Sequence, residues 1–334
     1  TYGSLVAGWL VERLTGYELL HISNRGFIAF SSVGTVCDGK ERDDTGDNST
    51  SGNSASKSAK ANQRLGRDAT HDNECESVLM KFCEMSARQL AAVDRDQTLI
   101  VIPIAATEQH GPHMPTGTDT FLCTAVAEAV ETRLSEQILL TPTVWLGASA
   151  HHLRLGSTID SRLDTYVATL DDIARSLLND GHRRLLFLNG HGGNIDPMRM
   201  AVRQLQPSYP SALLAAGSYW AVADEFIQQS LDGDHKYVGH ACEFETSMML
   251  HVRPELVDTQ QLVDAGQLIP DQMDGVFLSR DMRQRTHEGF TGRPDLATPE
   301  KGELLFAGIV DRLVTTVEKL LSEPLGTEYQ DFVR

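Results

Sequence analysis

The chain has 334 residues, of which 41% are hydrophobic and 22% charged, a balance typical of a globular protein with a substantial core. Its formal net charge is −17, from 46 acidic and 29 basic residues. Because this field repels phosphate backbones and no cluster of Lys or Arg reverses it, we expect no nucleic-acid partner.

The five cysteines have no C-x-x-C spacing, which indicates a reducing compartment and no disulfide framework. No apolar run approaches the length of a membrane span, and the best N-terminal candidate, residues 5–10, is cut off by Glu12 and Arg13. That stretch also lacks a basic segment and a clear cleavage site. The sequence therefore predicts a cytoplasmic protein without a membrane partner.

Composition divides the chain into three parts. Residues 1–36 contain scattered apolar groups and are predicted to be a weakly structured N-terminal extension. Residues 37–77 are predicted to be a disordered polar linker, because the run 43–58 has no large apolar residue to offset its ordering entropy. The catalytic domain is expected over residues 78–334.

Apolar runs in this third part alternate with helical patterns. Four runs are typical of strands: Leu99–Ile104, Ile138–Val144, Arg184–Asn189 and Leu213–Ser218. Apolar residues recur at helical spacing over residues 163–178 and 304–321, and those of each segment fall on one face. Strands that alternate with helices favour an α/β fold, with a mainly parallel central sheet in a three-layer α/β/α sandwich.

The first motif with visible chemistry follows the first strand directly: Glu108-Gln-His-Gly-Pro-His-Met-Pro-Thr-Gly-Thr-Asp119. Glu108 and His110 are two residues apart and project to the same side of an extended backbone, and Asp119 returns after a Pro/Gly-rich loop. Ionisable groups at the end of a buried strand are costly to desolvate unless they are paired. A zinc, manganese or iron ion would pair them, since neutral His and ionised carboxylates are its ligands.

Two further clusters lie where sites form in such sheets, at a strand end and a helix start. In Asn189-Gly-His-Gly-Gly-Asn194 the glycines leave His191 as the one strong ligand. Gly239-His-Ala-Cys-Glu-Phe-Glu-Thr-Ser247 opens an apolar helix and contains Glu243 and Glu245. Residues two apart on a helix diverge by about 200°, so at most one of these glutamates is expected to be a ligand.

Each cluster alone has a simpler interpretation. A His–Glu pair can be a surface or capping arrangement, and a Gly-rich turn can be a tight turn or a phosphate cradle. Asn194 with Asp196 and Pro197 can be only a helix start signal. Three clusters rich in His, Glu or Asp at strand ends and helix starts, taken together, favour a metal hydrolase.

Together the motifs resemble the creatininase (creatinine amidohydrolase) family. Its pattern has E-x-H-G-x-H-x-P with an Asp nine residues after the first His, then N-G-H, then H-A-x-x-x-E-T-S. Weaker matches are Gly147-Ala-Ser-Ala-His-His152 with Gly156-Ser-Thr158, and Gly292-Arg-Pro-Asp-Leu-Ala-Thr298 with Glu300-Lys-Gly302. The resemblance covers roughly residues 85–322, in order, and residues 1–80 have no counterpart in the pattern.

The resemblance implies a binuclear metal centre and a homo-oligomer, often a hexamer. Its metal ligands would be Glu108, His110, Asp119, His191 and a last Glu. Asp119 would bridge the two ions, with zinc preferred and manganese or iron as alternatives. His240 would deliver or take the proton at the departing nitrogen. The reaction would be hydrolysis of a C–N bond in a small or cyclic amide by a metal-activated water.

One departure from the family pattern concerns the residues after His191. The family's creatinine hydrolases continue N-G-H with Tyr-Glu-Asn, and that Glu is a ligand, whereas Gly192 and Gly193 follow here. The N-G-H-G-G-N branch is thought to use the Glu of E-T-S, which is Glu245 in this chain. The departure argues against creatinine as the substrate and leaves formamides and small peptides as alternatives.

The residues that line the pocket and the class of function each have alternative interpretations. His152, Tyr219 and Trp220, together with Trp145, suggest a partly aromatic substrate site, although they could equally belong to the core. A non-catalytic, metal-binding regulatory protein with a closed four-ligand site is one rival. A phosphate-binding enzyme that uses Gly190–Asn194 as a cradle is another, but no P-loop Lys-Ser/Thr follows.

Overall fold

The computed structural model describes residues 80–234 and 236–333, which belong to one compact unit. The expected extension over residues 1–36 and linker over residues 37–77 lie outside the described residues, so both stay predictions.

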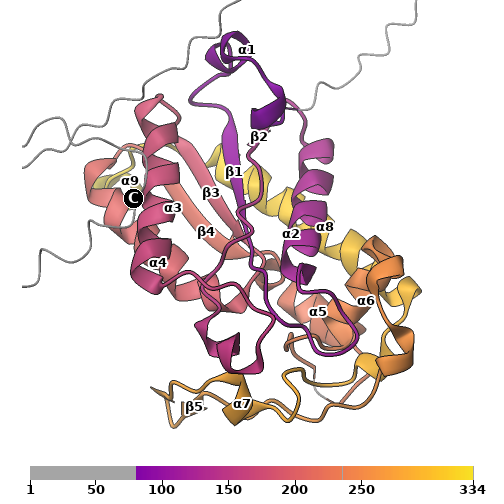
Figure 1. The fold of residues 1–334 in the computed structure, drawn as a ribbon. Helices are drawn as coiled ribbons and strands as arrows, with labels where there is room; N and C mark the ends of the chain where they lie inside the picture. The colour runs from indigo at the N-terminus through magenta and orange to yellow at the C-terminus, as the bar shows by residue number, and fades with distance from the viewer. Residues whose placement is uncertain (1–79, 235, 334) are drawn as a thin grey trace, which may run out of the picture. The chain divides into compact units, whose positions relative to one another are not determined.

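Four parallel strands form the central sheet in the order β2-β1-β3-β4 (Figure 1). They are β1 (Leu99–Ile104), β2 (Ile138–Leu140), β3 (Arg184–Asn189) and β4 (Leu213–Ser218). Three of them have the predicted bounds, but β2 ends four residues before the expected Val144. Pro142 has no N–H to donate to β1. Beyond β2 the pairing continues only through hydrogen bonds from Thr141 N–H and Val144 N–H and from Ala105 N–H to Val144 O.

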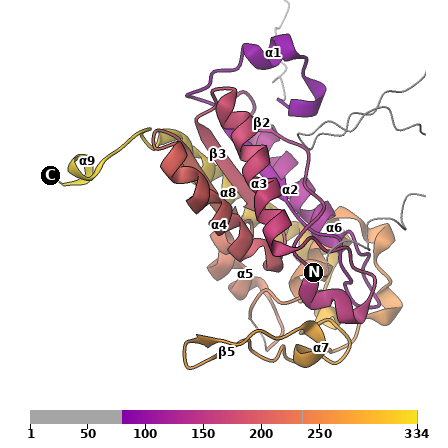
Figure 2. The ribbon, with the colours of Figure 1, turned by 60° about the vertical axis from the view of Figure 1, so that its left-hand side comes forward.

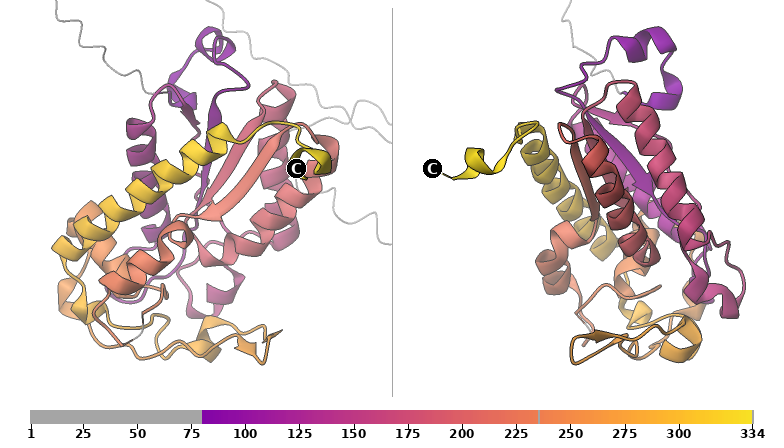
Figure 3. Two further views of the ribbon diagram at one scale, coloured as in Figure 1. Left: turned by 180° about the vertical axis from the view of Figure 1, so that it is seen from behind. Right: turned by 90° about the vertical axis from the view of Figure 1, so that its left-hand side faces the viewer.

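Helices cover both faces of the sheet, and side chains alternate between them along each strand. Leu99 and Val101 of β1 belong to the core beneath α2 (Thr118–Arg133), α6 (Glu243–Val252) and α8 (Pro299–Ser322). Ile100 and Ile102 belong to the core beneath α3 (Leu163–Asn179) and α4 (Ile195–Leu205). The edge-on view on the right of Figure 3 shows the sheet between these two layers, which confirms the predicted three-layer α/β/α sandwich.

The two helices predicted from periodicity are present, with different outer positions. Helix α3 begins at Leu163 as expected, but Leu163 itself is exposed rather than part of the buried stripe. Helix α8 begins before its apolar pattern, because the Thr298 side chain caps Lys301 N–H and Pro299 occupies the first turn. Leu304, expected on the apolar face of this helix, is also exposed.

The remaining elements are short. In the described part of the chain they are α1 (Ala87–Ala91), α5 (Asp224–Ser230), α7 (Met282–Arg285), α9 (Tyr329–Phe332), and the hairpin of β5 (Gln272–Met273) and β6 (Val276–Phe277). Several 3-10 turns are also present there, and η2 (Ala150–Leu155) and η3 (Gly192–Asn194) lie at the site. Helices α5, α6 and α7 gather beyond one end of the sheet (Figures 1 and 2). No helix in the described part of the chain is both long and apolar enough to cross a membrane.

Candidate metal centre

Glu108 and His110 lie in the loop after β1, and both side chains are almost fully buried. Gly111 turns this loop at a φ of 65°, a conformation that costs glycine little. Glu108 N–H then donates to Thr116 O at 2.9 Å, so the loop closes on itself. The return places Asp119 in the first turn of α2, beside His110.

His191 follows the carboxyl end of β3, where the Asn189 side chain holds its backbone. The Asn189 amide accepts from His191 N–H at 3.0 Å and donates to His191 O at 2.7 Å. The imidazole consequently faces the opening motif, with Nδ1 lying 3.0 Å from Asp119 Oδ2 and 3.3 Å from Glu108 Oε1.

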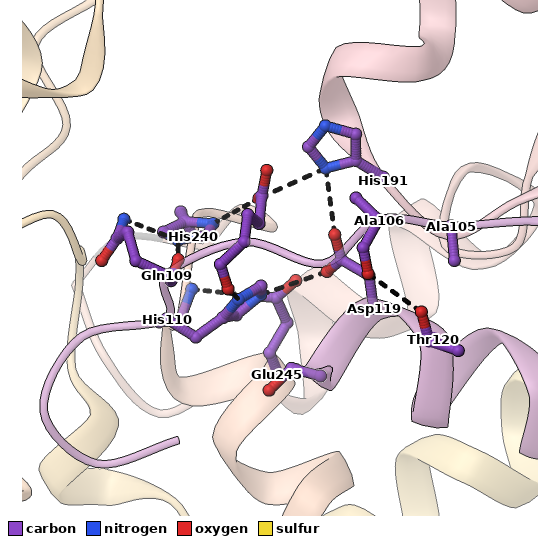
Figure 4. Close-up of polar contacts among 12 residues, drawn as sticks. Ala105, Ala106, Gln109, His110, Asp119, Thr120, His191, His240 and Glu245 are labelled. Carbon is purple, nitrogen blue, oxygen red and sulfur yellow. Dashed lines mark hydrogen bonds and ion pairs between the residues drawn. The ribbon is translucent and has the colours of Figure 1, made fainter. Parts of the chain in front are cut away.

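Asp119 lies between two imidazoles, one on each side of its carboxylate (Figure 4). Oδ1 is 3.1 Å from His110 Nε2, and Oδ2 is 3.0 Å from His191 Nδ1. Asp119 thus presents a different carboxylate oxygen to each imidazole.

Glu245 completes this group from the first turn of α6. One of its carboxylate oxygens and one ligand atom each of His110 and Asp119 lie within 4.8 Å of one another, and all three side chains are buried. Burial, with repulsion from Asp119, raises the pKa of Glu245 to about 7 despite the opposing effect of His110.

Glu243 has a different environment from Glu245, although both lie in the same helical turn. Its carboxylate contacts Lys301 Nζ and accepts hydrogen bonds from the backbone N–H groups of residues 232–233 at 2.8 and 3.0 Å. The structure therefore directs only one of the two glutamates toward the histidines, as the helical geometry predicted.

Three histidines of the site each direct one ring nitrogen at a backbone carbonyl. The pairs are His110 Nδ1 with Glu108 O at 3.0 Å, His191 Nε2 with Ala148 O at 3.2 Å, and His240 Nε2 with Gln109 O at 2.7 Å. A carbonyl only accepts, so each bonded nitrogen carries the proton. In the neutral ring, the second nitrogen then presents a lone pair.

Each of these second nitrogens faces a carboxylate. His110 Nε2 and His191 Nδ1 face Asp119, and His240 Nδ1 lies 3.6 Å from Glu108 Oε1. A lone pair and a carboxylate repel each other unless a proton or a cation lies between them. Histidines held in this way by an outer carbonyl are typical of metal ligands.

The unsatisfied atoms of the site agree with a cation. Glu108 Oε2, His110 Nε2 and Asp119 Oδ2 are buried without a hydrogen-bond partner. Burial lowers the pKa of His110, but attraction by Asp119 outweighs this and raises it to about 9. The pocket thus stabilises added positive charge, and its imidazole and carboxylate donors fit a divalent zinc, manganese or iron ion.

His240, two residues before the N-cap of α6, contacts the same group. Its ring centroid is 4.3 Å from that of His110 and 4.4 Å from that of His152. Burial and the neighbouring His110 lower the pKa of His240 to about 3, so its Nδ1 is a neutral acceptor.

His152 lies behind Glu108 and is itself buried. Gln109 Nε2 lies 2.8 Å from both His152 Nδ1 and Gly289 O, which assigns the amide as donor and Nδ1 as acceptor. His152 Nε2 then carries the proton and points at Glu108 Oε1, 3.3 Å away. This geometry orients the Glu108 carboxylate, and the role of His152 as a substrate contact stays a prediction.

The aromatic candidates occupy different environments. Tyr219 is fully buried, with its ring 5.1 Å from Trp220 and 6.4 Å from Phe244, and Trp220 packs partly buried against the same core. Trp145 is exposed. Substrate binding by Tyr219 and Trp220 therefore stays a prediction.

Sequence reasoning missed two residues at the site, Gln109 and His151. Gln109 belongs to the opening motif but carries no ligand chemistry, so its bonds to His152 and Gly289 had no sequence signal. His151 lies in η2, with its ring stacked 5.7 Å from that of His191. The segment Gly147–His152 was the available signal for it.

Comparison with known proteins identifies the family. The family model described as Creatininase: Creatinine amidohydrolase matches residues 83–317. The chain belongs to the creatininase family.

Individual creatininase relatives agree with this assignment. A mycofactocin precursor peptide peptidase from Mycobacterium ulcerans is 34% identical over 239 residues, which cover 68% of this chain and 87% of the relative. A creatinine amidohydrolase from Pseudomonas putida is 29% identical and is covered to 92%, with 69% of this chain. A creatininase crystal structure superposes with a TM-score of 0.63 at 26% identity, covering 73% of this chain and 98% of the other.

These comparisons confirm the predicted family and fold, and this chain is a hydrolase of that family acting on carbon–nitrogen bonds. Solved creatininases that superpose on it include a Zn-Zn type and an Mn form.

Proposed function

We propose that this chain is a metal-dependent amidohydrolase with a binuclear centre. The observation that carries the proposal is the position of Asp119, whose two oxygens face Nε2 of His110 and Nδ1 of His191. His110, Asp119 and Glu245 would hold one ion, and Glu108, His191 and Asp119 the other. The zinc and manganese of the related creatininases support divalent cations at these donors. Zinc is the preferred metal, with manganese or iron as alternatives.

Bound ions at such a centre polarise a carbonyl and lower the pKa of a shared water, so that hydroxide is available near neutral pH. The residues of this chain supply the remaining chemistry. His240 is neutral, and its Nε2–H is fixed on Gln109 O, which leaves Nδ1 free to take a proton. From there it would pass the proton to the departing nitrogen of the amide, as a general acid.

The substrate is proposed to be a small or cyclic amide. The Gly192 and Gly193 that follow His191 argue against creatinine itself, because they lack the ligand that creatinine hydrolases carry there. A short peptide is the second candidate, and the 34% identity to the Mycobacterium ulcerans peptide peptidase favours it. A formamide remains the third possibility. Assembly into a homo-oligomer, as a hexamer, and a cytoplasmic location are further proposals.

Metal quantification of the purified chain, followed by a panel of cyclic amides, formamides and short peptides, tests the proposal. We expect two divalent ions per chain, loss of hydrolysis after chelation, and recovery when zinc or manganese is returned. Hydrolysis by metal-free protein would contradict the metal-dependent mechanism. Two tightly bound ions without turnover of any amide would favour the regulatory alternative instead.

A further inference from the structure

His151 occupies a position that distinguishes it from the other histidines of the site. One of its ring nitrogens, a carboxylate oxygen of Glu108 and a ring nitrogen of His191 all lie within 4.8 Å of one another. Its ring is stacked on that of His191, with an interplanar angle of 22°. The side chain is half-buried in η2, whereas Glu108 and His191 are buried.

Neither ring nitrogen of His151 hydrogen-bonds to any of the described residues. The outer nitrogens of His110, His191 and His240 are each held by a backbone carbonyl. His152 differs again, since it is held between Gln109 and Glu108. His151 therefore offers a ring nitrogen near two ligand atoms, and neither of its ring nitrogens has a hydrogen-bond partner among the described residues.

Gly193 makes room for this imidazole. A Cβ on residue 193 would lie 2.8 Å from His151 Cε1, 2.5 Å from His191 Nε2 and 2.1 Å from Ala148 O. Contacts this short do not occur, so a larger residue would displace the Ala148 carbonyl or the two imidazoles. The lack of a side chain at residue 193 thus leaves room for both imidazoles beside the Ala148 carbonyl.

We propose that His151 is an additional ligand of the ion held by Glu108 and His191. The inference rests on the proposed metal centre and adds a third imidazole to its ligands, from a segment outside the three motifs that contain the other ligands. Because His151 has no second partner to fix its ring, it would be the most readily exchanged protein ligand of that ion.

Zinc binding by the full chain tests this. The His151→Phe variant keeps an aromatic ring against His191 and removes the nitrogen donor. A matched control, His287→Phe, changes a histidine whose side chain is 90% exposed and whose contact is with Glu288. Zinc per chain and both dissociation constants are measured by competition with a chromophoric chelator, and the visible spectrum of the cobalt-loaded protein reports the ligand field.

In His151→Phe we expect one zinc dissociation constant unchanged and the other raised about 10-fold or more, together with a changed cobalt spectrum. His287→Phe should match the unmodified chain. If His151→Phe does not fold by circular dichroism, His151→Gln gives the same comparison with a polar side chain.

Unchanged zinc constants and an unchanged cobalt spectrum in a folded His151 variant would overturn the proposal. If the unmodified chain holds two zinc ions and hydrolyses an amide in that case, the proposed function stands without His151. If the unmodified chain binds no zinc, manganese or iron, both proposals fall.

Discussion

A buried ionisable residue lies at each end of strand β3, and the two residues have different kinds of partner. Arg184 begins the strand, and its guanidinium donates to the carbonyls of Asp96, Leu320 and Glu323 at 2.7 to 2.8 Å. His191 follows the other end, and its Nδ1 faces the carboxylates of the opening motif. Both side chains are at most 5% exposed.

The Arg184 guanidinium stabilises the fold, whereas the His191 imidazole is positioned to bind a ligand. At the amino end, the chain itself supplies the acceptors that a buried guanidinium needs. At the carboxyl end, buried imidazole nitrogens and carboxylates face one another, and this arrangement needs a proton or a metal cation between them. The comparison predicts that substitutions at the two ends affect different measurements.

Replacing Asp119 by Ala should have the largest effect. It removes the carboxylate between His110 and His191, and with it the proposed bridge between the ions. Loss of several kcal/mol of transition-state stabilisation corresponds to a rate about 1000-fold lower. Amide hydrolysis and metal content are measured together, and an Asp119→Ala chain that keeps both ions would remove Asp119 from the ligand set.

Arg184→Met should affect stability without affecting metal content. The substitution leaves three carbonyls without their donor, so we expect a loss of about 3 kcal/mol in the free energy of unfolding. Denaturant titration of metal-free protein measures this, and zinc content is the control. Loss of zinc from folded Arg184→Met would show that the two ends of the strand are not independent.

The same distinction explains how far the sequence could predict the molecule. Strands β1 and β3 were predicted with their bounds because their apolar runs are local signals. The opening motif was predicted as a site because its ionisable residues follow β1 directly. The prediction that Leu163 is buried was wrong, because helical periodicity does not indicate how far along the helix the covering elements extend.

Contacts between loops were not predictable in this way. His151 approaches His191 from a segment 40 residues earlier, and Gln109 links Glu108 to His152 and Gly289 through bonds that depend on three separate loops. The choice between Glu243 and Glu245 likewise required the position of Lys301, 58 residues beyond Glu243. Spacing along the chain limits such choices but does not make them.

Glu243 and Glu245 provide the same comparison within one helical turn: the first is paired within the fold, and the second faces the proposed metal centre. Glu243→Gln weakens a buried ion pair with Lys301 and should cost about 2 kcal/mol of stability while metal content stays unchanged. Glu245→Gln should reduce metal content instead, because an amide is a poorer ligand than a carboxylate. Each variant is the control for the other. Loss of metal from Glu243→Gln but not from Glu245→Gln would show that Glu243 is the ligand.

His182 lies two residues before β3 and is an exception at the amino end, because the described part of the chain does not supply hydrogen-bond partners for its buried ring. It is buried, and neither ring nitrogen has a hydrogen-bond partner among the described residues. Burial, aided by the charge of Arg95, lowers the pKa of His182 to about 4 although Asp180 opposes the shift. The fold therefore holds the neutral ring.

A folded-state pKa below the unfolded value of about 6.5 fixes the direction of the effect. The stability that depends on neutral His182 is complete above pH 6.5 and is lost as the pH falls from 6.5 toward 4. His182→Leu should remove this dependence, so the loss of stability between pH 7 and pH 5 becomes smaller by about 1 kcal/mol, with solvent screening allowed for. Denaturant titrations of metal-free protein at both pH values measure it, since the titrating groups of the metal centre contribute equally to both chains. An equal loss in the variant and the unmodified chain would show that His182 does not contribute to the pH dependence of stability. The amino end of β3 would then contain no exception to the comparison.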